Sequence, residues 1–365
     1  MVRFLHTADW QVGMKAARFG EAGKRVREER LIAGRRVIEA ARQREVDFII
    51  VAGDLFEDNA VDRTLLQQTA DILASASCTV FVIPGNHDPL VPGSVWEHRC
   101  WETLSKVIIL KENAPFAAPG CTLFPCPLRE KQSGENPTNW IRAEPNGTTL
   151  IGIAHGSVEG ATIGEWDHPI PRNAATRSGL DYLALGHWHS MGTFEDAAGA
   201  SRMAYSGTHE PTSFGERDSG NALLVEISCA GAVPVITTLP TGRLNWISRT
   251  EKIYASGDLE ALGRQIDILP NPETTLLDLS LSGLMSPSDR EELDRITELA
   301  KARFLWAWID STGMAPAPED DSWVEALPPG LLREVAIRVK LSEAEPEVKV
   351  RALLDLFSIV EETRL

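Results

Sequence analysis

Three short segments decide the fold of this chain: HTADWQ at residues 6–11, VAGDLFED at 51–58 and PGNHDP at 84–89. In each, an apolar run rich in β-branched residues gives way to a polar loop that carries a glycine or an acid, which is typical of a buried strand that ends there. Helix-like stretches at 21–44 and 63–76 separate the runs. This alternation predicts an α/β fold with a layered sheet, in which loops at the carboxyl ends of strands are the usual place for a site.

A change of composition near residue 230 divides the chain, because the elements beyond it carry no polar residues in motif-like positions. We predict a first domain at 1–230, a smaller α+β domain at 245–325 and C-terminal helices at 328–365. Further strands are predicted at 150–155, 181–187, 221–227, 274–284 and 304–310, and further helices at 288–304, 331–341 and 346–362. Ser288 with Glu291 predicts a capping box for the first of these helices.

The composition restricts the class of protein. With 43% hydrophobic and 24% charged residues, the 365-residue chain is typical of a globular protein of about two domains. Its five cysteines form no Cys-x-x-Cys pair, which argues against a disulfide framework or a zinc knuckle. Asp9 comes too early for a secretory signal, and no apolar run reaches the ~18 residues of a membrane helix. We expect a cytoplasmic protein with no membrane partner.

The net charge of −16 argues against a nucleic-acid partner, because such affinity depends largely on neutralising phosphates. The charge is unevenly distributed, however. Residues 15–44 carry ten basic residues against four acids, a local charge of +6, whereas residues 251–365 carry twelve against twenty-three, a net of −11. The net charge of the whole chain therefore does not exclude a nucleic acid that binds to the basic segment at 15–44.

Polar side chains of ligand type gather at the predicted strand ends. These side chains are Asp9, Asp54, Asn86, His87, Asp88, His155, His187 and His189. Carboxylate, imidazole and amide ligands without thiolates suit manganese, iron or zinc, and the oxygen-rich share favours Mn(II). Eight candidate ligands are more than a single ion can bind. Two bridged ions ~3.5 to 4 Å apart polarise a phosphodiester and activate a water, so the pattern predicts two-metal phosphoester hydrolysis.

These motifs resemble the calcineurin-like metallophosphoesterases and, within them, the SbcD-type DNA repair exonucleases. The general likeness rests on HTADW, VAGDLFED, PGNHD, AHGS and LGHWH. The narrower likeness rests on HTADW, on YSGTHEPTSFGERDSGNALLVEI at 205–227 and on LSLSGLMSPSDREELDRI at 279–296, which is similar to the capping domain of that group. The resemblance implies a layered β-sandwich flanked by helices, a capping domain that recognises DNA, and Mn-dependent exonuclease and endonuclease activity.

The resemblance also implies two ion sites that share Asp54. The first is implied to use Asp9, Asp54 and His189, and the second to use Asp54, Asn86, His155 and His187. His87 is then implied to stabilise the transition state or protonate the leaving oxygen, since histidine exchanges protons near neutral pH. Asp88 is implied to orient His87.

Gln11 departs from the family pattern, which usually has histidine at this position of the first ion site. A glutamine amide oxygen is a neutral, poorer donor for a metal ion. Two interpretations follow. In one, the enzyme is active with a weaker first ion that prefers Mn(II); in the other, catalysis is lost and the cluster persists for binding.

Several other residues are candidates for DNA binding. Arg25, Arg27 and Arg35 lie on the basic first helix, where a phosphate backbone can be followed. Trp10 and Trp188 flank ligand positions and can stack on an unpaired base, although a tryptophan at a strand end also suits a core. His209 lies in the segment at 205–227 that carries the family likeness.

The partners follow from the resemblance as well. The chain has no Walker A motif, because GEAGKR from Gly20 lacks the required spacing, so any ATP dependence must come from a partner. The resemblance implies an SbcC-like coiled-coil ATPase held by C-terminal helices, and a homodimer. The apolar face at 350–357 can serve such a partner or can pack on its own domain.

Two alternatives to a nuclease remain open. The metal motifs are shared with phosphatases and cyclic-nucleotide phosphodiesterases, although the additional residues after the first domain favour a substrate larger than these enzymes take. The second alternative is a catalytically weakened scaffold that binds DNA or the ATPase.

Overall fold

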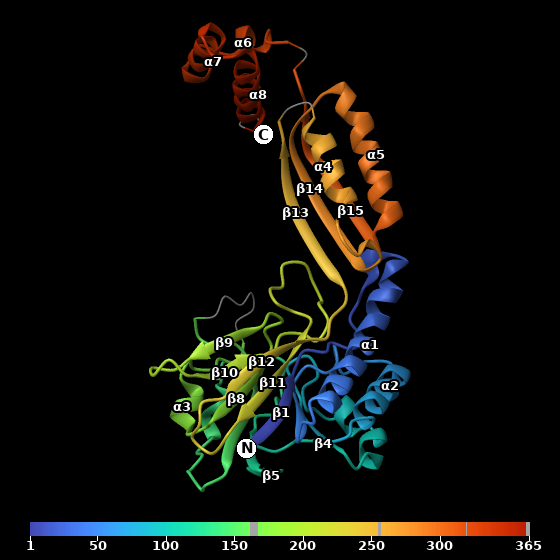
Figure 1. The fold of residues 1–365 in the computed structure, drawn as a ribbon, viewed down its shortest axis with the longest axis vertical. Coiled ribbons are helices and arrows are strands. Elements are labelled where there is room, and N and C mark those ends of the chain that lie inside the picture. Colours follow the sequence, from blue (N-terminus) through green and yellow to red (C-terminus); the bar gives the residue numbers. More distant parts are fainter. Residues whose placement is uncertain (161–166, 255–256, 319, 363–365) are drawn as a thin grey trace. The chain divides into compact units, whose positions relative to one another are not determined.

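A computed structural model of the chain describes residues 1–160, 167–254, 257–318 and 320–362 (Figure 1). The chain divides into two compact units, Met1–Leu244 and Asn245–Leu365, and the C-terminal helices belong to the second. Within the described residues, no helix is both long and apolar enough to cross a membrane.

The first unit is built around two β-sheets. The first sheet has the strand order β12-β11-β1-β2-β3-β4, with strands β12 (Val235–Pro240), β11 (Asn221–Ile227), β1 (Val2–Thr7), β2 (Phe48–Ala52), β3 (Thr79–Ile83) and β4 (Val107–Ile109). The second has the order β5-β6-β7-β8-β10-β9, with strands β5 (Phe116–Ala118), β6 (Cys121–Pro125), β7 (Thr149–His155), β8 (Tyr182–Gly186), β10 (Ser201–Tyr205) and β9 (Gly192–Glu195).

The central strands β2 and β3 of the first sheet are almost wholly apolar because both of their faces are buried. In β2, Phe48 and Ile50 pack in a core that also contains residues of the second sheet, such as Ile151. The alternate residues Ile49 and Val51 pack in another core with apolar residues of the helices. This alternation places one sheet between a layer of helices and the other sheet.

Helices flank these two layers. Helices α1 (Ala22–Gln43) and α2 (Arg63–Ala74) contribute to the core of the first sheet, and the short α3 (Ala174–Ser178) packs on the second (Figure 1). Helix α2 begins after Asp62, whose carboxylate accepts hydrogen bonds from the backbone N–H groups of Thr64 and Leu65. The prediction of layered sheets flanked by helices is therefore confirmed.

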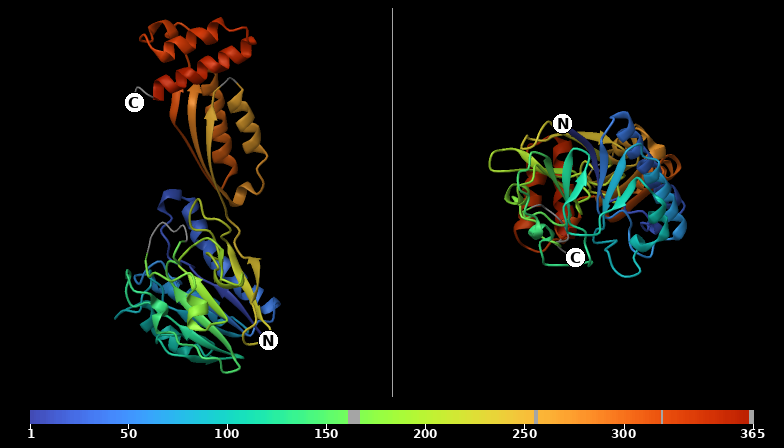
Figure 2. Two further views of the ribbon diagram at one scale, coloured as in Figure 1. Left: turned by 90° about the vertical axis from the view of Figure 1, so that its left-hand side faces the viewer. Right: turned by 90° about the horizontal axis from the view of Figure 1, so that it is seen from below.

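The second unit contains a parallel sheet in the order β13-β14-β15, with strands β13 (Asn245–Ile253), β14 (Thr275–Met285) and β15 (Trp306–Pro316). Helices α4 (Asp258–Asp267) and α5 (Pro287–Arg303) pack on one face of it (Figure 2). The chain then forms α6 (Trp323–Ala326), α7 (Leu331–Leu341) and α8 (Pro346–Glu362), which share a small apolar core.

Candidate metal centre

Loops at the ends of parallel strands from both sheets bring the predicted ligands together. Asp9 and Asp54 follow β1 and β2, which are parallel neighbours of the first sheet, and His155 ends β7 of the second sheet. Each of these three residues offers a ligand atom that lies within 4.8 Å of the other two. All three side chains are buried. Buried carboxylates and an imidazole this close together form a candidate metal site.

The backbone at this site is strained. Asp9, Gln11, Asp54 and His187 have φ angles of 54°, 47°, 51° and 109°, in the left-handed region that side chains other than glycine seldom adopt. Such residues cost on the order of 1–3 kcal/mol each and persist where surrounding contacts hold them. Here the first two loops hold one another, since Asp9 N–H donates to the Gly53 carbonyl at 3.1 Å and Gln11 N–H to the Asp54 carbonyl at 3.0 Å.

Two glycines of the sequence motifs allow the loops to come this close. A Cβ atom at Gly53, where φ is +92°, would lie 2.4 Å from His155 Nδ1. A Cβ atom at Gly85 would lie 2.1 Å from Asp54 Oδ1. No side chain fits at either distance, so the glycines that precede Asp54 and Asn86 are required by the packing of the site.

Asn86, His155 and His187 form a second group of ligand atoms. Asn86 Oδ1 lies 2.8 Å from His155 Nε2 and 3.1 Å from His187 Nδ1. On the other side of the His155 ring, Nδ1 lies 2.9 Å from the Ala52 carbonyl. With its proton on Nδ1, the ring presents the Nε2 lone pair to a metal ion, as carbonyl-bonded histidine ligands do. The three residues therefore suit the second ion site that the resemblance implies.

The ionisation of the site also suits a cation. Burial lowers the pKa of His155, but the charge of Asp54 outweighs it and raises this pKa to about 9. Burial favours the neutral form of Asp54, yet His155 and His87 lower its pKa overall. Burial raises the pKa of Asp9 to about 6. In the metal-free protein a proton on His155 thus offsets part of the charge of the buried carboxylates, and a divalent ion can replace it.

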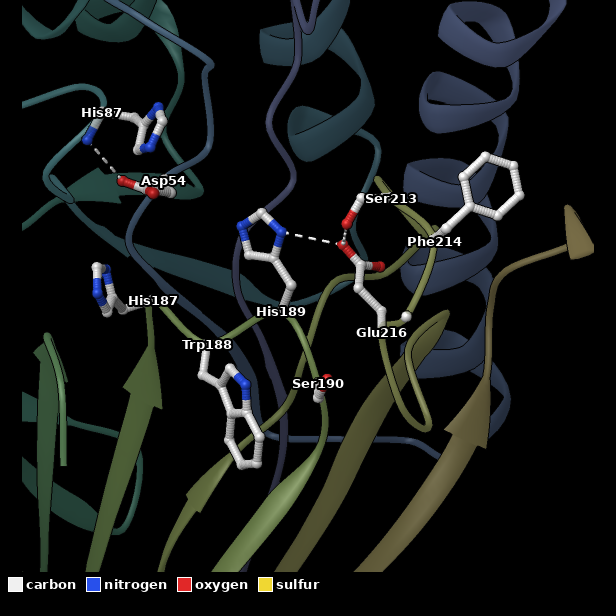
Figure 3. A pocket seen from close by; sticks show the side chains of 10 residues that line it. Asp54, His87, His187, Trp188, His189, Ser190, Ser213, Phe214 and Glu216 are labelled. Carbon is white, nitrogen blue, oxygen red and sulfur yellow. Dashed lines mark hydrogen bonds and ion pairs between the residues drawn. The ribbon is translucent and has the colours of Figure 1, made fainter. Parts of the chain in front are cut away.

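His189 is oriented by Glu216, a residue that the sequence analysis did not identify as part of the site. Its Nδ1 lies 2.8 Å from Thr212 Oγ1 and 3.1 Å from Glu216 Oε1. Its other ring nitrogen turns away from Glu216 toward the side of the cavity where Asp54 and His187 lie (Figure 3). Burial lowers the pKa of His189, but the hydrogen bond to Glu216 and nearby carboxylates raise it overall. Glu216 is separated from His189 by 27 positions, and its only signal was its place in the family-like segment.

Gln11 lies at the first ion site, and its side-chain oxygen is placed to act as a metal ligand. Its Nε2 donates a hydrogen bond of 2.9 Å to Asp54 Oδ2. Its Oε1 is buried without a hydrogen-bond partner among the described residues. A buried carbonyl oxygen without a partner is costly, on the order of 1–3 kcal/mol. The residues at both predicted sites therefore fit divalent ions.

His87 lies at the mouth of the site, and the role predicted for Asp88 is wrong. His87 Nδ1 lies 2.9 Å from the Glu57 carbonyl, which orients the ring. The buried carboxylate of Asp88 accepts instead from the backbone N–H groups of Phe56 at 2.9 Å and Gly85 at 2.7 Å. Asp88 thus holds the loop after β2 against the loop after β3 and contacts backbone rather than substrate.

The candidate DNA-binding residues divide into two groups. Trp10 and His209 are fully buried and stack on one another, with ring centroids 4.6 Å apart, so the prediction that they contact DNA is wrong. Trp188 is half-buried and lines the cavity. Three arginines on α1 are exposed, namely Arg25, Arg27 and Arg35. Arg25 also pairs with the buried Glu29 at 3.0 Å.

A cavity of about 530 Å³ opens at the site. Its lining combines ligand residues with two aromatic side chains, and consists of Asp54, His87, His187, Trp188, His189, Ser190, Ser213, Phe214, Gly215 and Glu216 (Figure 3). Asp54 and His87 are held together by a 2.9 Å hydrogen bond from His87 N–H to Asp54 Oδ1. The cavity thus gives a phosphoester access to both the ligands and His87.

Comparisons with known proteins found several similar chains. An uncharacterized metallophosphoesterase, YhaO of Bacillus subtilis, is 29% identical over 175 residues, which cover 45% of this chain and 42% of that protein. TT1561 of Thermus thermophilus has a TM-score of 0.42 at 12% identity, covering 66% of this chain and 99% of that one. A dimetal phosphatase of Danio rerio has a TM-score of 0.39 at 13% identity, covering 65% and 98%.

The comparison with protein families covers more of the chain. The calcineurin-like phosphoesterase family matches residues 2–191. This range is more than half of the chain and contains every predicted ligand. The resemblance to the metallophosphoesterases is therefore confirmed: this chain belongs to the calcineurin-like phosphoesterases, which are metal-dependent hydrolases of phosphoesters.

Proposed function

We propose that this chain is a manganese-dependent DNA nuclease of the SbcD type, which hydrolyses phosphodiester bonds in DNA end processing or repair. The observation that carries the proposal is a contact at the wall of the cavity. The guanidinium of the exposed Arg18 lies over the ring of Phe214, 5.1 Å from its centroid, and Phe214 lines the cavity. The basic segment at 15–44 therefore begins beside the ligand residues, where a phosphate backbone that enters the site would pass.

The chain's own residues have separate tasks in this reaction. Divalent ions, when bound, supply Lewis acidity for the scissile phosphate and activate water as the nucleophile. His87 is held by the Glu57 carbonyl at Nδ1, so its Nε2 is available at the cavity to donate a proton to the leaving oxygen. Trp188 is half-buried and lines the cavity, and a base next to the scissile bond can stack on the part of it that remains accessible.

The proposed partner is an SbcC-like ATPase, and a homodimer of this chain is part of the same proposal. The helices α7 and α8 carry apolar side chains that remain exposed, including Leu331 at 75%, Leu341 at 79% and Val350 at 58%. Exposed apolar side chains such as these can contribute to a surface that binds another protein where they lie together. Since the chain lacks a Walker A motif, ATP-driven steps would require such a partner.

One assay separates the nuclease from the alternatives. The purified chain with Mn(II) is given a labelled duplex, a single strand and a p-nitrophenyl phosphodiester, beside the variants Asp54→Asn and His87→Ala. His98→Ala is the matched control, because His98 lies outside the cavity lining and caps a 3₁₀ helix. We expect Mn-dependent cleavage of DNA that both site variants lose and the control keeps.

Other outcomes would contradict the proposal. Turnover of the small diester without cleavage of DNA would assign the chain to the phosphatases or cyclic-nucleotide phosphodiesterases. No turnover of any substrate, with binding of DNA or of the ATPase retained, would assign it to the scaffolds.

A further inference from the structure

Arg30 of α1 is a fully buried arginine behind the metal centre, with only 1% of its surface exposed. A charged group in such a place is costly unless its donors are all matched by acceptors. Burial lowers the pKa of Arg30 to about 10, so the guanidinium stays protonated at neutral pH. The sequence pattern gave this residue no role beyond its charge.

The guanidinium donates to backbone carbonyls of two separate segments. Nε and Nη2 donate to the Trp10 carbonyl at 2.8 and 2.5 Å, and Nη2 also lies 3.3 Å from the Asp9 carbonyl. On its other side, Nη1 donates to the carbonyls of Glu210 at 2.9 Å and Pro211 at 3.1 Å. One planar group therefore joins the strained loop after β1 to the turn after β10.

Each of these segments leads to a ligand of the first ion site. Asp9 itself is one ligand of that site. On the other segment, Pro211 is followed by Thr212, whose N–H donates to Glu216 Oε2 at 3.0 Å. Glu216 in turn orients the ring of His189. The contacts thus run from Arg30 to both Asp9 and His189.

Packing also fixes the backbone of Arg30. The Trp10 ring stacks on His209, and His209 Nε2 lies 2.8 Å from the Arg30 carbonyl. Gly34, one turn further along α1, lies against Trp10 so closely that a Cβ there would be 2.6 Å from the ring. Arg30 is therefore held through both its backbone and its side chain.

We propose that Arg30 is a positioning residue for the first ion site, because one guanidinium fixes the distance between the loop of Asp9 and the turn that orients His189. The inference rests on the two-ion site of the proposed function. The effect of Arg30 should be larger at the first ion, because Arg30 makes no contact with the segments of Asn86 and His155 and reaches the second site only through the bond of His187 N–H to Asp9 and the shared Asp54.

The test measures ion binding rather than turnover. Mn(II) is titrated calorimetrically into the whole chain, as wild type, Arg30→Met and Arg30→Lys, and an Asn86→Ala variant identifies the step that belongs to the second ion. Arg42→Met is the matched control. Arg42 is on the same helix, and its guanidinium bonds to Glu39 at 2.6 and 2.8 Å rather than to the loop of Asp9 or the turn at 210–211.

We expect Arg30→Met to weaken the first ion by about 10- to 100-fold, the usual effect of losing a residue that orients a metal ligand. Binding of the second ion should weaken less than binding of the first in this variant. Both binding steps should stay unchanged in Arg42→Met, and Arg30→Lys should weaken the first ion less than Arg30→Met. Circular dichroism verifies that each variant is folded.

Four results would overturn the inference. Equal weakening of both steps, or unchanged binding in Arg30→Met, would remove the specific role while leaving the proposed function intact. Failure of both Arg30 variants to fold would assign the residue to the stability of the whole unit. Absence of any ion binding by the wild type would instead refute the ion sites and, with them, the role of Arg30.

Discussion

Replacing Gln11 by histidine tests whether residue 11 is a ligand of the first ion. In the metal-free structure, the side-chain amide donates from Nε2 to Asp54 Oδ2 at 2.9 Å. An ion that takes Asp54 as a ligand competes with this hydrogen bond. A hydrogen bond to a charged group contributes about 1.5–3 kcal/mol, so glutamine makes ion binding weaker by an amount in that range.

Histidine avoids most of this cost. Its imidazole offers a lone pair without an amide that must first release Asp54. The left-handed backbone at residue 11, with φ of 47°, also suits histidine better than most side chains. We take the lower end of the range and expect the first ion to bind roughly tenfold more tightly, about 1.4 kcal/mol, with hydrolysis retained.

The assay is a calorimetric titration of Mn(II) into wild type and Gln11→His, followed by turnover of a p-nitrophenyl phosphodiester. Gln132→His, in an exposed loop, is the control for an added surface imidazole. Equal Mn(II) affinity in wild type and Gln11→His would refute the assignment of Gln11 as a ligand. Loss of turnover despite tighter Mn(II) binding would refute the view that residue 11 affects only the affinity of the first ion.

Further predictions concern the rest of the site and its charge. Glu216→Gln should weaken the first ion by about 10- to 100-fold, because Glu216 orients His189; calorimetry would detect this, and unchanged binding would contradict it. His87→Ala should lower kcat by about 10²- to 10⁴-fold and leave Mn(II) affinity unchanged, since His87 acts on the substrate; parallel loss of affinity would make His87 a ligand instead. Burial lowers the pKa of His155 but Asp54 raises it to about 9, above the ordinary 6.5. The stabilisation of the metal-free protein from this pair should therefore be complete below about pH 6.5 and lost as the pH rises through about 9, while Mn(II) affinity rises over the same interval; thermal unfolding and calorimetry between pH 6 and 10 measure both. Arg27→Glu should weaken DNA binding and flatten its dependence on log salt by about 0.9 per lost phosphate contact; an unchanged slope would remove α1 from the DNA path.

The sequence predicted those parts of the fold that have a strong local pattern. Strands β2 and β3 were evident because burial on both faces makes them apolar throughout. The edge strands β4, β5 and β9 have only three or four residues with partly exposed side chains, so they show no pattern to recognise. The predicted cap of α5 was displaced as well, because Pro287 occupies the first helical turn and makes Ser286 the cap, with Asp289 as its partner.

The candidate site was predictable as far as residues next to strand ends are concerned. Strand order brings Asp9 and Asp54 to one edge of the first sheet, since parallel strands end at the same edge. His155 ends a strand of the second sheet and joins them through the packing of the two sheets. Residues that support the ligands have no such signal. Glu216 and Arg30 act through contacts that close only when distant segments meet, and the fully buried Trp10 shows that a position beside a ligand does not imply exposure.

The origin of the ligands in separate loops has a consequence for the chain during its synthesis. His187 N–H bonds to the carboxylate of Asp9, 178 residues earlier, so the site cannot close until both sheets exist. A nascent or partly folded chain therefore lacks the ion sites and cannot hydrolyse phosphoesters. Ion binding in turn selects the complete first unit and adds its binding free energy to that state alone. Catalytic competence and completed folding thus become a single event.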